Sequence, residues 1–129
     1  MNTTPVRLLL VDDEERFVTT LARLLGLRGM AVTSALSAEQ ALAAFAPGAF
    51  DVALLDVKMP GVSGVDLLVE LRKRDPDIEV IMLTGHASVD VAAEIMSRGG
   101  SDYLLKPCPT DDIAAKILSA YERRCAKKG

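Results

Sequence analysis

Residues 51–56 read Asp-Val-Ala-Leu-Leu-Asp, a short apolar run that ends in a carboxylate. Such a run is typical of a strand that is buried on both faces of a parallel sheet. An unpaired buried charge is costly, so Asp56 should have a cationic partner. Ligand sites in open α/β sheets lie beyond the carboxyl ends of the strands. This stretch therefore predicts an α/β fold with a functional site around Asp56.

Three other apolar runs also end in polar residues. These are residues 6–11 before Asp12 and Asp13, residues 80–83 before Thr84, and residues 103–105 before Lys106. If all these runs are parallel strands, their polar groups meet at one edge of one sheet. Clustered carboxylates repel one another, and a divalent cation relieves this repulsion. Oxygen ligands with one lysine and one hydroxyl predict a site for Mg²⁺ (or Mn²⁺) and a phosphoryl group.

Short β-rich runs alternate with helical patterns along the chain, which predicts a parallel sheet covered by helices on both faces. The expected strands are residues 6–11, 31–35, 52–56, 79–84 and 103–105, with a helix after each. Gly29 should cap the end of the first helix. Ser37 with Gln40 resembles a capping box that opens a second helix carrying Phe45.

The later helices have equally clear boundaries in the sequence. The third should stop before Pro76. The fourth is expected over residues 88–98, with Ser88 as its cap. Its expected buried face consists of Val89, Ala92, Ala93 and Met96. The last helix should start at Thr110 and end in the basic residues 123–128, which suit a helix C-terminus or begin a linker.

The bulk composition narrows the class of protein. The chain has 129 residues, the length of one ordinary domain, and half of them are hydrophobic. The net charge of −3 gives no reason to expect binding to nucleic acid or to an anionic membrane. No apolar run approaches the ~20 residues of a transmembrane helix, and the N-terminus lacks a signal-peptide pattern. The expected location is the cytoplasm, where Cys108 and Cys125 would stay reduced.

Four segments resemble the response-regulator receiver domain of two-component signalling. They are Val-Asp-Asp-Glu at 11–14, Leu-Asp-Val-Lys-Met-Pro-Gly at 55–61, Leu-Thr-Gly at 83–85 and Asp-Tyr-Leu-Leu-Lys-Pro at 102–107. The resemblance extends from Val6 to around Arg124. It implies a flavodoxin-like (βα)5 three-layer sandwich with a five-stranded parallel sheet in the order 2-1-3-4-5. It also implies one receiver domain over residues 1–129, whose last residues could begin a linker to an output domain.

The resemblance implies a role for each acidic residue of the site. Asp56 would be the phosphoryl acceptor, with a sensor histidine kinase or a phosphotransfer protein as the donor. Asp13 would bind Mg²⁺ directly, and Asp12 would help, partly through water. Asp56 and the backbone carbonyl of Lys58 would complete the protein ligands of the metal.

The other polar residues would act on the phosphoryl group. Lys106 would pair with Asp56 and then with the phosphoryl oxygens, and Thr84 would hydrogen-bond the phosphoryl group. Tyr103 resembles the switch aromatic of the family, and Lys106-Pro107 resembles its cis peptide. Lys58 and His86, each two residues after a site residue, stand at positions that often tune the lifetime of the phosphate.

Three other classes share part of this pattern. A flavodoxin-like electron carrier would have the same fold, but the acidic residues 12–15 would repel the FMN phosphate. A haloacid-dehalogenase-like phosphatase also forms an aspartyl phosphate, but it needs a second Asp where this chain has Lys58. A vestigial receiver would be a phosphorylation-independent interaction module, and the intact set of site residues argues against it.

The resemblance implies a signalling domain and not a conventional enzyme, although the domain would catalyse its own phosphorylation and autodephosphorylation. We expect the signal to leave through the surface formed by helix four, strand five and helix five. Thr84 leads into that helix and Tyr103 lies on that strand. The surface would bind an output domain or a second copy of the chain. No direct contact with nucleic acid or membrane is expected.

Overall fold

The computed structural model describes residues 5–85 and 89–128, and the predictions for His86 and Ser88 fall outside them. The elements are β1 (Arg7–Val11), α1 (Glu15–Leu27), β2 (Ala31–Ala35), α2 (Ala38–Ala44), β3 (Val52–Asp56), α3 (Gly64–Arg74), β4 (Glu79–Thr84), α4 (Val89–Ser97), β5 (Asp102–Leu105) and α5 (Thr110–Lys128). All strand pairs are parallel, and the sheet order is β2-β1-β3-β4-β5. The predicted flavodoxin-like fold is confirmed.

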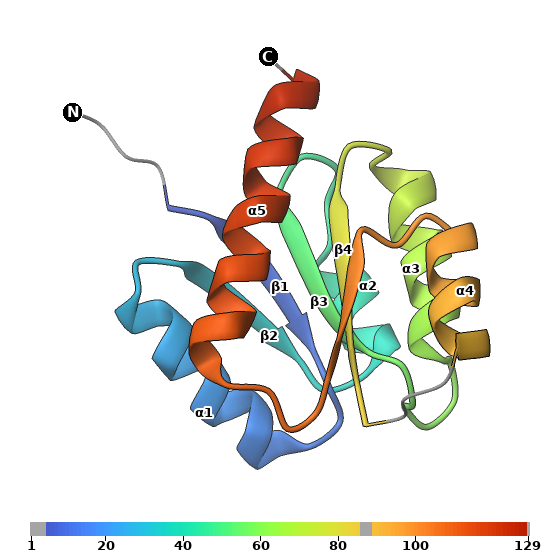
Figure 1. Ribbon diagram of the computed structural model, residues 1–129, viewed down its shortest axis with the longest axis horizontal. Coiled ribbons are helices and arrows are strands. Elements are labelled where there is room, and N and C mark those ends of the chain that lie inside the picture. Colours follow the sequence, from blue (N-terminus) through green and yellow to red (C-terminus); the bar gives the residue numbers. More distant parts are fainter. Residues whose placement is uncertain (1–4, 86–88, 129) are drawn as a thin grey trace.

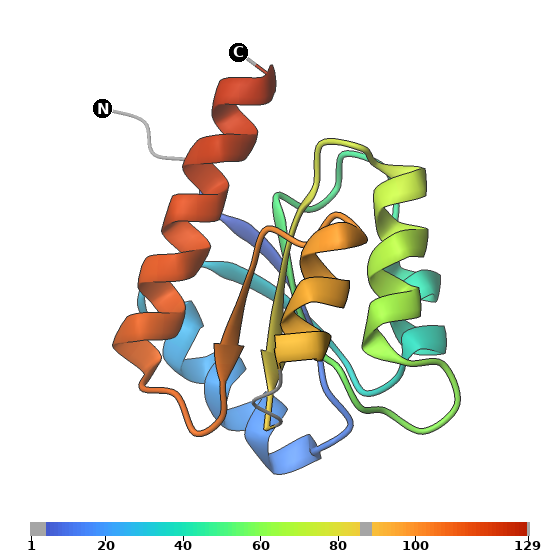
Figure 2. The same cartoon turned by 45° about the vertical axis from the view of Figure 1, so that its right-hand side comes forward.

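Helices cover both faces of the sheet, with α1 and α5 on one side and α2, α3 and α4 on the other (Figure 1). Figure 2 shows the same layers turned, with α4 and α3 side by side over their face. Successive strand residues point to opposite faces. One core therefore receives Leu9, Ala53, Leu55, Val80 and Met82. The other core receives Leu8, Leu10, Val52, Leu54 and Ile81.

The predicted boundaries of the first two helices hold with one exception. Gly29 has a φ of 88° just after α1, a conformation that glycine adopts at low cost. Ser37 Oγ accepts a hydrogen bond from the Gln40 backbone N–H, and Gln40 Oε1 accepts one from the Leu36 N–H. Phe45 was expected inside α2, but its extended backbone ends the helix and its ring stacks on Phe50.

The predicted buried face of α4 is wrong. Val89 and Met96 are exposed, Ala93 is exposed as well, and only Ile95 of this helix is fully buried. Apolar residues occur on several sides of α4, so their spacing did not single out one face. Ile95 lies against Gly100, where an added Cβ would overlap the Ile95 side chain.

Among the described helices, none is long and apolar enough to span a bilayer.

Buried carboxylates near the N-terminal ends of β3 and β4, at the end of the sheet away from Asp56, pair with basic residues in the C-terminal part of α5. Arg124 is 1 % exposed, and its Nε donates to Asp51 Oδ1 at 3.1 Å. Its Nη2 lies 3.4 Å from Asp75 Oδ2. Arg7 donates to Asp51 from Nε and Nη2, at 3.2 and 2.8 Å. Burial raises the pKa of Asp51, but the hydrogen bonds from Arg7 outweigh it and hold the pKa below its usual value.

A second carboxylate at this end completes the attachment of α5. Arg123 and Lys127 donate to Glu79 at 2.9 and 2.5 Å, and Ser101 Oγ donates to it at 2.8 Å. Burial raises the pKa of Glu79, but these hydrogen bonds outweigh burial and hold the pKa below its usual value. The basic residues at the end of the chain therefore hold α5 on the sheet, a role that the sequence pattern alone did not indicate.

We expect Asp51→Ala to lower the free energy of unfolding by about 3–5 kcal/mol, because it leaves the buried Arg124 guanidinium without its closest partner. Urea denaturation at pH 7 measures this change. Asp111→Asn is the control, because Asp111 forms its ion pair with Arg28 on the surface. Exposed pairs contribute little, so the control should change stability by less than about 1 kcal/mol. Equal losses in the two variants would contradict this account.

Candidate functional site

Strand register alone brings four of the predicted site residues to one edge of the sheet. Val11 pairs with Leu55, so the next residues, Asp12 and Asp56, stand side by side. Asp56 in turn pairs with Leu83, the residue before Thr84. Thr84 is opposite Leu105, the residue before Lys106. These four residues therefore come together because each one ends, or directly follows, a strand of a parallel sheet.

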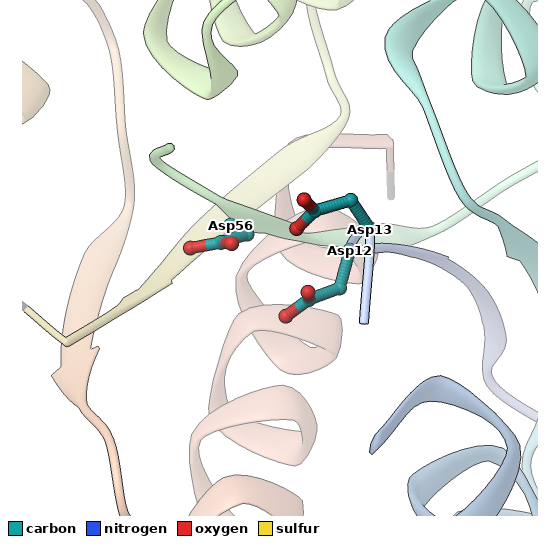
Figure 3. Close-up of side chains that lie close together, drawn as sticks. All are labelled: Asp12, Asp13 and Asp56. Carbon is teal, nitrogen blue, oxygen red and sulfur yellow. The ribbon is translucent and has the colours of Figure 1, made fainter. Parts of the chain in front are cut away.

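The carboxylates of Asp12, Asp13 and Asp56 form a tight cluster (Figure 3). One oxygen from each lies within 4.8 Å of the others. Asp12 and Asp56 are buried, whereas Asp13 is exposed. A hard divalent cation such as Mg²⁺ prefers oxygen ligands of this kind, usually one or two carboxylates with water in the remaining positions. The donor set therefore fits Mg²⁺, with Asp13 open to solvent and able to share a hydrated ion.

The surroundings of Asp56 raise its pKa well above the ordinary value of an aspartate. Burial, together with the negative charge of Asp12, raises the pKa of Asp56 to about 6. The ammonium of Lys106 and a hydrogen bond from the Lys58 backbone N–H act in the opposite direction but do not cancel the rise. A bound cation would favour the ionised form of Asp56 and lower this pKa.

Lys106 is the cationic group of the site, although its closest partner differs from the predicted one. Its Nζ donates to Asp12 Oδ2 at 2.6 Å and to Glu14 Oε1 at 3.1 Å. The distance to Asp56 Oδ2 is 3.8 Å, an ion pair without a hydrogen bond. Burial lowers the pKa of Lys106, but its hydrogen bonds to Asp12 and Glu14 raise it above the usual value.

The backbone around Lys106 fixes the base of its side chain. The Lys106-Pro107 peptide bond is cis, as the family resemblance implied. The Lys106 backbone N–H donates to the Thr84 carbonyl at 2.8 Å, which ties the end of β5 to the end of β4. Thr84 itself is buried at the edge of the sheet.

Two other predicted residues lie at the margin of the site. Tyr103 lies on β5 with 37 % of its surface exposed, and Lys58 is exposed in the loop after β3. His86 lies outside the described residues. The roles assigned to Tyr103, Lys58 and His86 therefore stay predictions.

Three residues near the site had no predicted role there. Glu14 bonds to Lys106, but in the sequence it was only one of four consecutive acids. The Lys106 Nζ lies over the Phe17 ring, 4.6 Å from its centre, although the sequence pattern indicated no role for Phe17 in the site. Gly64 lies so close to β3 that an added Cβ would overlap the Asp56 carbonyl oxygen. None of these contacts has a signal in sequence spacing, because each depends on the assembled fold.

Comparisons with known sequences and with solved structures point to the same protein family. The sequence model described as response regulator receiver domain matches residues 8–118. The alginate biosynthesis transcriptional regulatory protein AlgB of Pseudomonas aeruginosa is 38% identical over 118 residues, which cover 92% of this chain and 26% of AlgB. The transcriptional regulatory protein FixJ of Azorhizobium caulinodans is 39% identical over 113 residues, which cover 88% of this chain and 54% of FixJ. The chain spans about a quarter of the first relative and about half of the second.

Solved structures agree with the sequence relatives. A response regulator receiver domain protein from Clostridium thermocellum superposes with a TM-score of 0.89 at 35% identity, covering 94% of this chain and 98% of that one. A CheY-like receiver domain protein from Methanospirillum hungatei gives a TM-score of 0.90 at 30% identity, covering 98% and 100%. Because the family match spans most of the chain and the fold is the same, this chain belongs to the response-regulator receiver family of two-component signalling.

Proposed function

We propose that Asp56 accepts a phosphoryl group from a sensor histidine kinase or a phosphotransfer protein, and that the domain then changes conformation to regulate a partner. The observation that carries this proposal is the position of Asp56. It is a buried strand-end carboxylate that shares one cluster with Asp12 and Asp13 and forms an ion pair with Lys106. This combination provides a nucleophile together with the positive charge that phosphoryl transfer requires.

Each residue of the site has its own role in the transfer step. A carboxylate oxygen of Asp56 forms a bond to phosphorus, and the bond between phosphorus and the donor atom breaks with its electron pair leaving on the donor. Lys106 neutralises charge on the phosphoryl oxygens as they approach. Asp12 and Asp13 would hold Mg²⁺ with Asp56 and the Lys58 carbonyl, and the bound ion would supply further charge neutralisation and orientation.

The product is an acyl phosphate, which water can hydrolyse back to the Asp56 carboxylate and inorganic phosphate. The domain would in this way end its own signal. Lys58 and His86 would influence how long the phosphate lasts, because they flank the acceptor and the hydroxyl of Thr84 in sequence. The chemistry serves signalling, so the domain is not a conventional enzyme.

The output would leave through the α4–β5–α5 face. A phosphoryl group offers the Thr84 hydroxyl a new acceptor, and that differential contact can move the loop after β4 and allow Tyr103 to turn inward. The face exposes the apolar side chains of Val89, Met96, Tyr103 and Leu105. It is therefore suited to bind a second copy or an output domain.

The relatives suggest what such a partner does. AlgB and FixJ are named as transcriptional regulators and are longer than this chain, so we propose that the output is a change in transcription. Direct binding of nucleic acid by this domain is not expected from its net charge of −3. A cytoplasmic location remains the prediction from the sequence. Neither a vestigial receiver nor a phosphatase has a specific observation in its favour.

We expect acetyl phosphate and Mg²⁺ to add one phosphoryl group to the protein, as measured by intact mass. Asp56→Asn should take up none, because it removes the nucleophile. Asp66→Asn is the matched control, since Asp66 is an exposed acid outside the cluster, and it should be labelled at the wild-type rate. Labelling of Asp56→Asn at the wild-type rate, or undiminished labelling of the wild type in excess EDTA, would contradict the proposal.

Removing the Asp56 charge should stabilise the metal-free protein at neutral pH. Because the folded protein raises the pKa of Asp56 to about 6, it holds this proton more tightly than the unfolded chain does. The contribution of Asp56 to stability therefore falls as the pH rises from about 4 to about 6. At pH 7 in EDTA we expect the free energy of unfolding of Asp56→Asn to exceed that of the wild type by about 2 kcal/mol.

Urea denaturation at two pH values separates this electrostatic effect from a change in packing. The advantage of Asp56→Asn should largely disappear near pH 3, about one unit below the ordinary pKa of aspartate, where Asp56 is mostly protonated in both the folded and the unfolded state. Saturating Mg²⁺ should also reduce the advantage at pH 7, because the wild type binds the ion better. An advantage of the same size at both pH values would mean that charge is not its cause.

We expect phosphorylation to change hydrogen exchange most in α4 and β5. Among the described residues of α4 only Ile95 is fully buried, whereas α3 buries five residues, so less apolar contact opposes a shift of α4. Exchange measured by mass spectrometry before and after treatment with acetyl phosphate should differ over residues 89–105. Changes confined to α1 and α2 would rule out this route for the signal.

A further inference from the structure

Among the described residues, three carboxylates and one aromatic ring lie around the Lys106 ammonium, and Asp56, the reactive carboxylate, is not its closest partner. Asp12 Oδ2 is at 2.6 Å and Glu14 Oε1 is at 3.1 Å, while Asp56 Oδ2 is at 3.8 Å. The Lys106 Nζ also lies over the ring of Phe17, 4.6 Å from the ring centre. The resting ammonium is therefore held mainly by groups at the start of α1 and at the end of β1.

Glu14 is placed to make this contact by the way in which α1 begins. It is the N-cap residue of α1, but its side chain does not cap the helix. Its backbone N–H donates to Asp12 Oδ1 at 3.0 Å, which fixes Glu14 relative to the carboxylate that also bonds to Lys106. Its own carboxylate is left to reach Lys106. The Glu14 side chain remains 67% exposed, so this bond can break and leave a well-hydrated carboxylate.

Phe17 limits the positions that the ammonium can occupy. It lies in the first turn of α1, three residues after the N-cap Glu14, and both side chains contact the same ammonium. A lysine ammonium is attracted to the face of an aromatic ring. The start of α1, from its N-cap through its first turn, thus provides an acidic contact and an aromatic contact to the same cation.

We infer that Glu14 is a positioning residue that latches Lys106 in the resting state, with Phe17 supporting the ammonium, and that Glu14 releases Lys106 when a phosphoryl group arrives. This inference rests on the proposed phosphorylation of Asp56. A phosphoryl group carries more charge than an exposed glutamate and brings it next to the buried Asp56, so it competes successfully for the ammonium. Glu14 therefore stabilises only the unphosphorylated state. A contact present in one state alone shifts the balance between the two.

Glu14→Gln tests the latch, because it keeps the size of the side chain and removes its charge. We expect acetyl phosphate with Mg²⁺ to phosphorylate this variant about two- to five-fold faster than the wild type, the range that corresponds to loss of a largely exposed ion pair. Glu15→Gln is the matched control. It removes the same charge one residue later, from an exposed side chain that forms no ion pair with Lys106 in the described structure. The control should react at the wild-type rate.

A double-variant cycle shows whether Glu14 acts through Lys106. In a Lys106→Ala background, which should still accept some phosphate, Glu14→Gln should give no further acceleration. If Glu14→Gln and Glu15→Gln accelerate the reaction equally, the effect is simple repulsion of the anionic donor and the latch is wrong. The latch is equally wrong if the acceleration persists without Lys106.

Nuclear magnetic resonance of the unphosphorylated protein tests the contact independently of any phosphorylation. The ammonium protons of Lys106 should exchange with water faster in Glu14→Gln than in the wild type or in Glu15→Gln. Phe17→Leu should move the Lys106 ammonium signal by removing the ring, while Phe17→Tyr should leave it nearly in place. Unchanged ammonium exchange in Glu14→Gln would overturn the latch even if Asp56 is phosphorylated as proposed. A wild type that takes up no phosphate would overturn the proposed function instead.

Discussion

Repulsion between Asp12 and Asp56 is the constraint on which the rest of the site depends. The parallel register of β1 and β3 forces these two buried carboxylates together, and Asp13 adds a third charge within 4.8 Å. Among the described residues, Lys106 is the lysine that pairs with these carboxylates, and its backbone N–H donates a hydrogen bond to the Thr84 carbonyl. One ammonium cannot neutralise three carboxylates, so the site retains an excess of negative charge that favours a divalent cation.

An aspartate stands at each end of β3, and the two carboxylates have different electrostatic surroundings. Asp51 directly precedes this strand and Asp56 ends it, and both are buried. Hydrogen bonds from Arg7 hold the pKa of Asp51 below its usual value, whereas burial and Asp12 raise that of Asp56 to about 6. At the Asp51 end the charges are paired and the C-terminal part of α5 is attached to the sheet. At the Asp56 end the pairing is incomplete, which is typical of a functional site.

The elements that could be predicted from the sequence are those that depend on strand ends. Four of the five predicted strands end in a polar residue or directly precede one, so a parallel sheet predicts that Asp12, Asp56, Thr84 and Lys106 meet. The sheet order was implied by the family resemblance and not by these strand ends. The buried face of α4 could not be predicted, because the helix is apolar on several sides and tertiary packing chose Ile95. The contacts of Lys106 with Glu14 and Phe17, and of Arg124 with Asp51, join residues far apart in the chain and have no local signal.

Calorimetric titration with Mg²⁺ in buffers of different ionisation enthalpy is the most direct test of this electrostatic account, because it counts the protons that the ion displaces. Since the pKa of Asp56 is about 6, Mg²⁺ binding at pH 6 should release a substantial fraction of one proton, and binding at pH 8 should release almost none. Asp56→Asn should bind the ion more weakly and release no proton at either pH. Proton release that is the same at pH 6 and pH 8, or that survives in Asp56→Asn, would contradict the account.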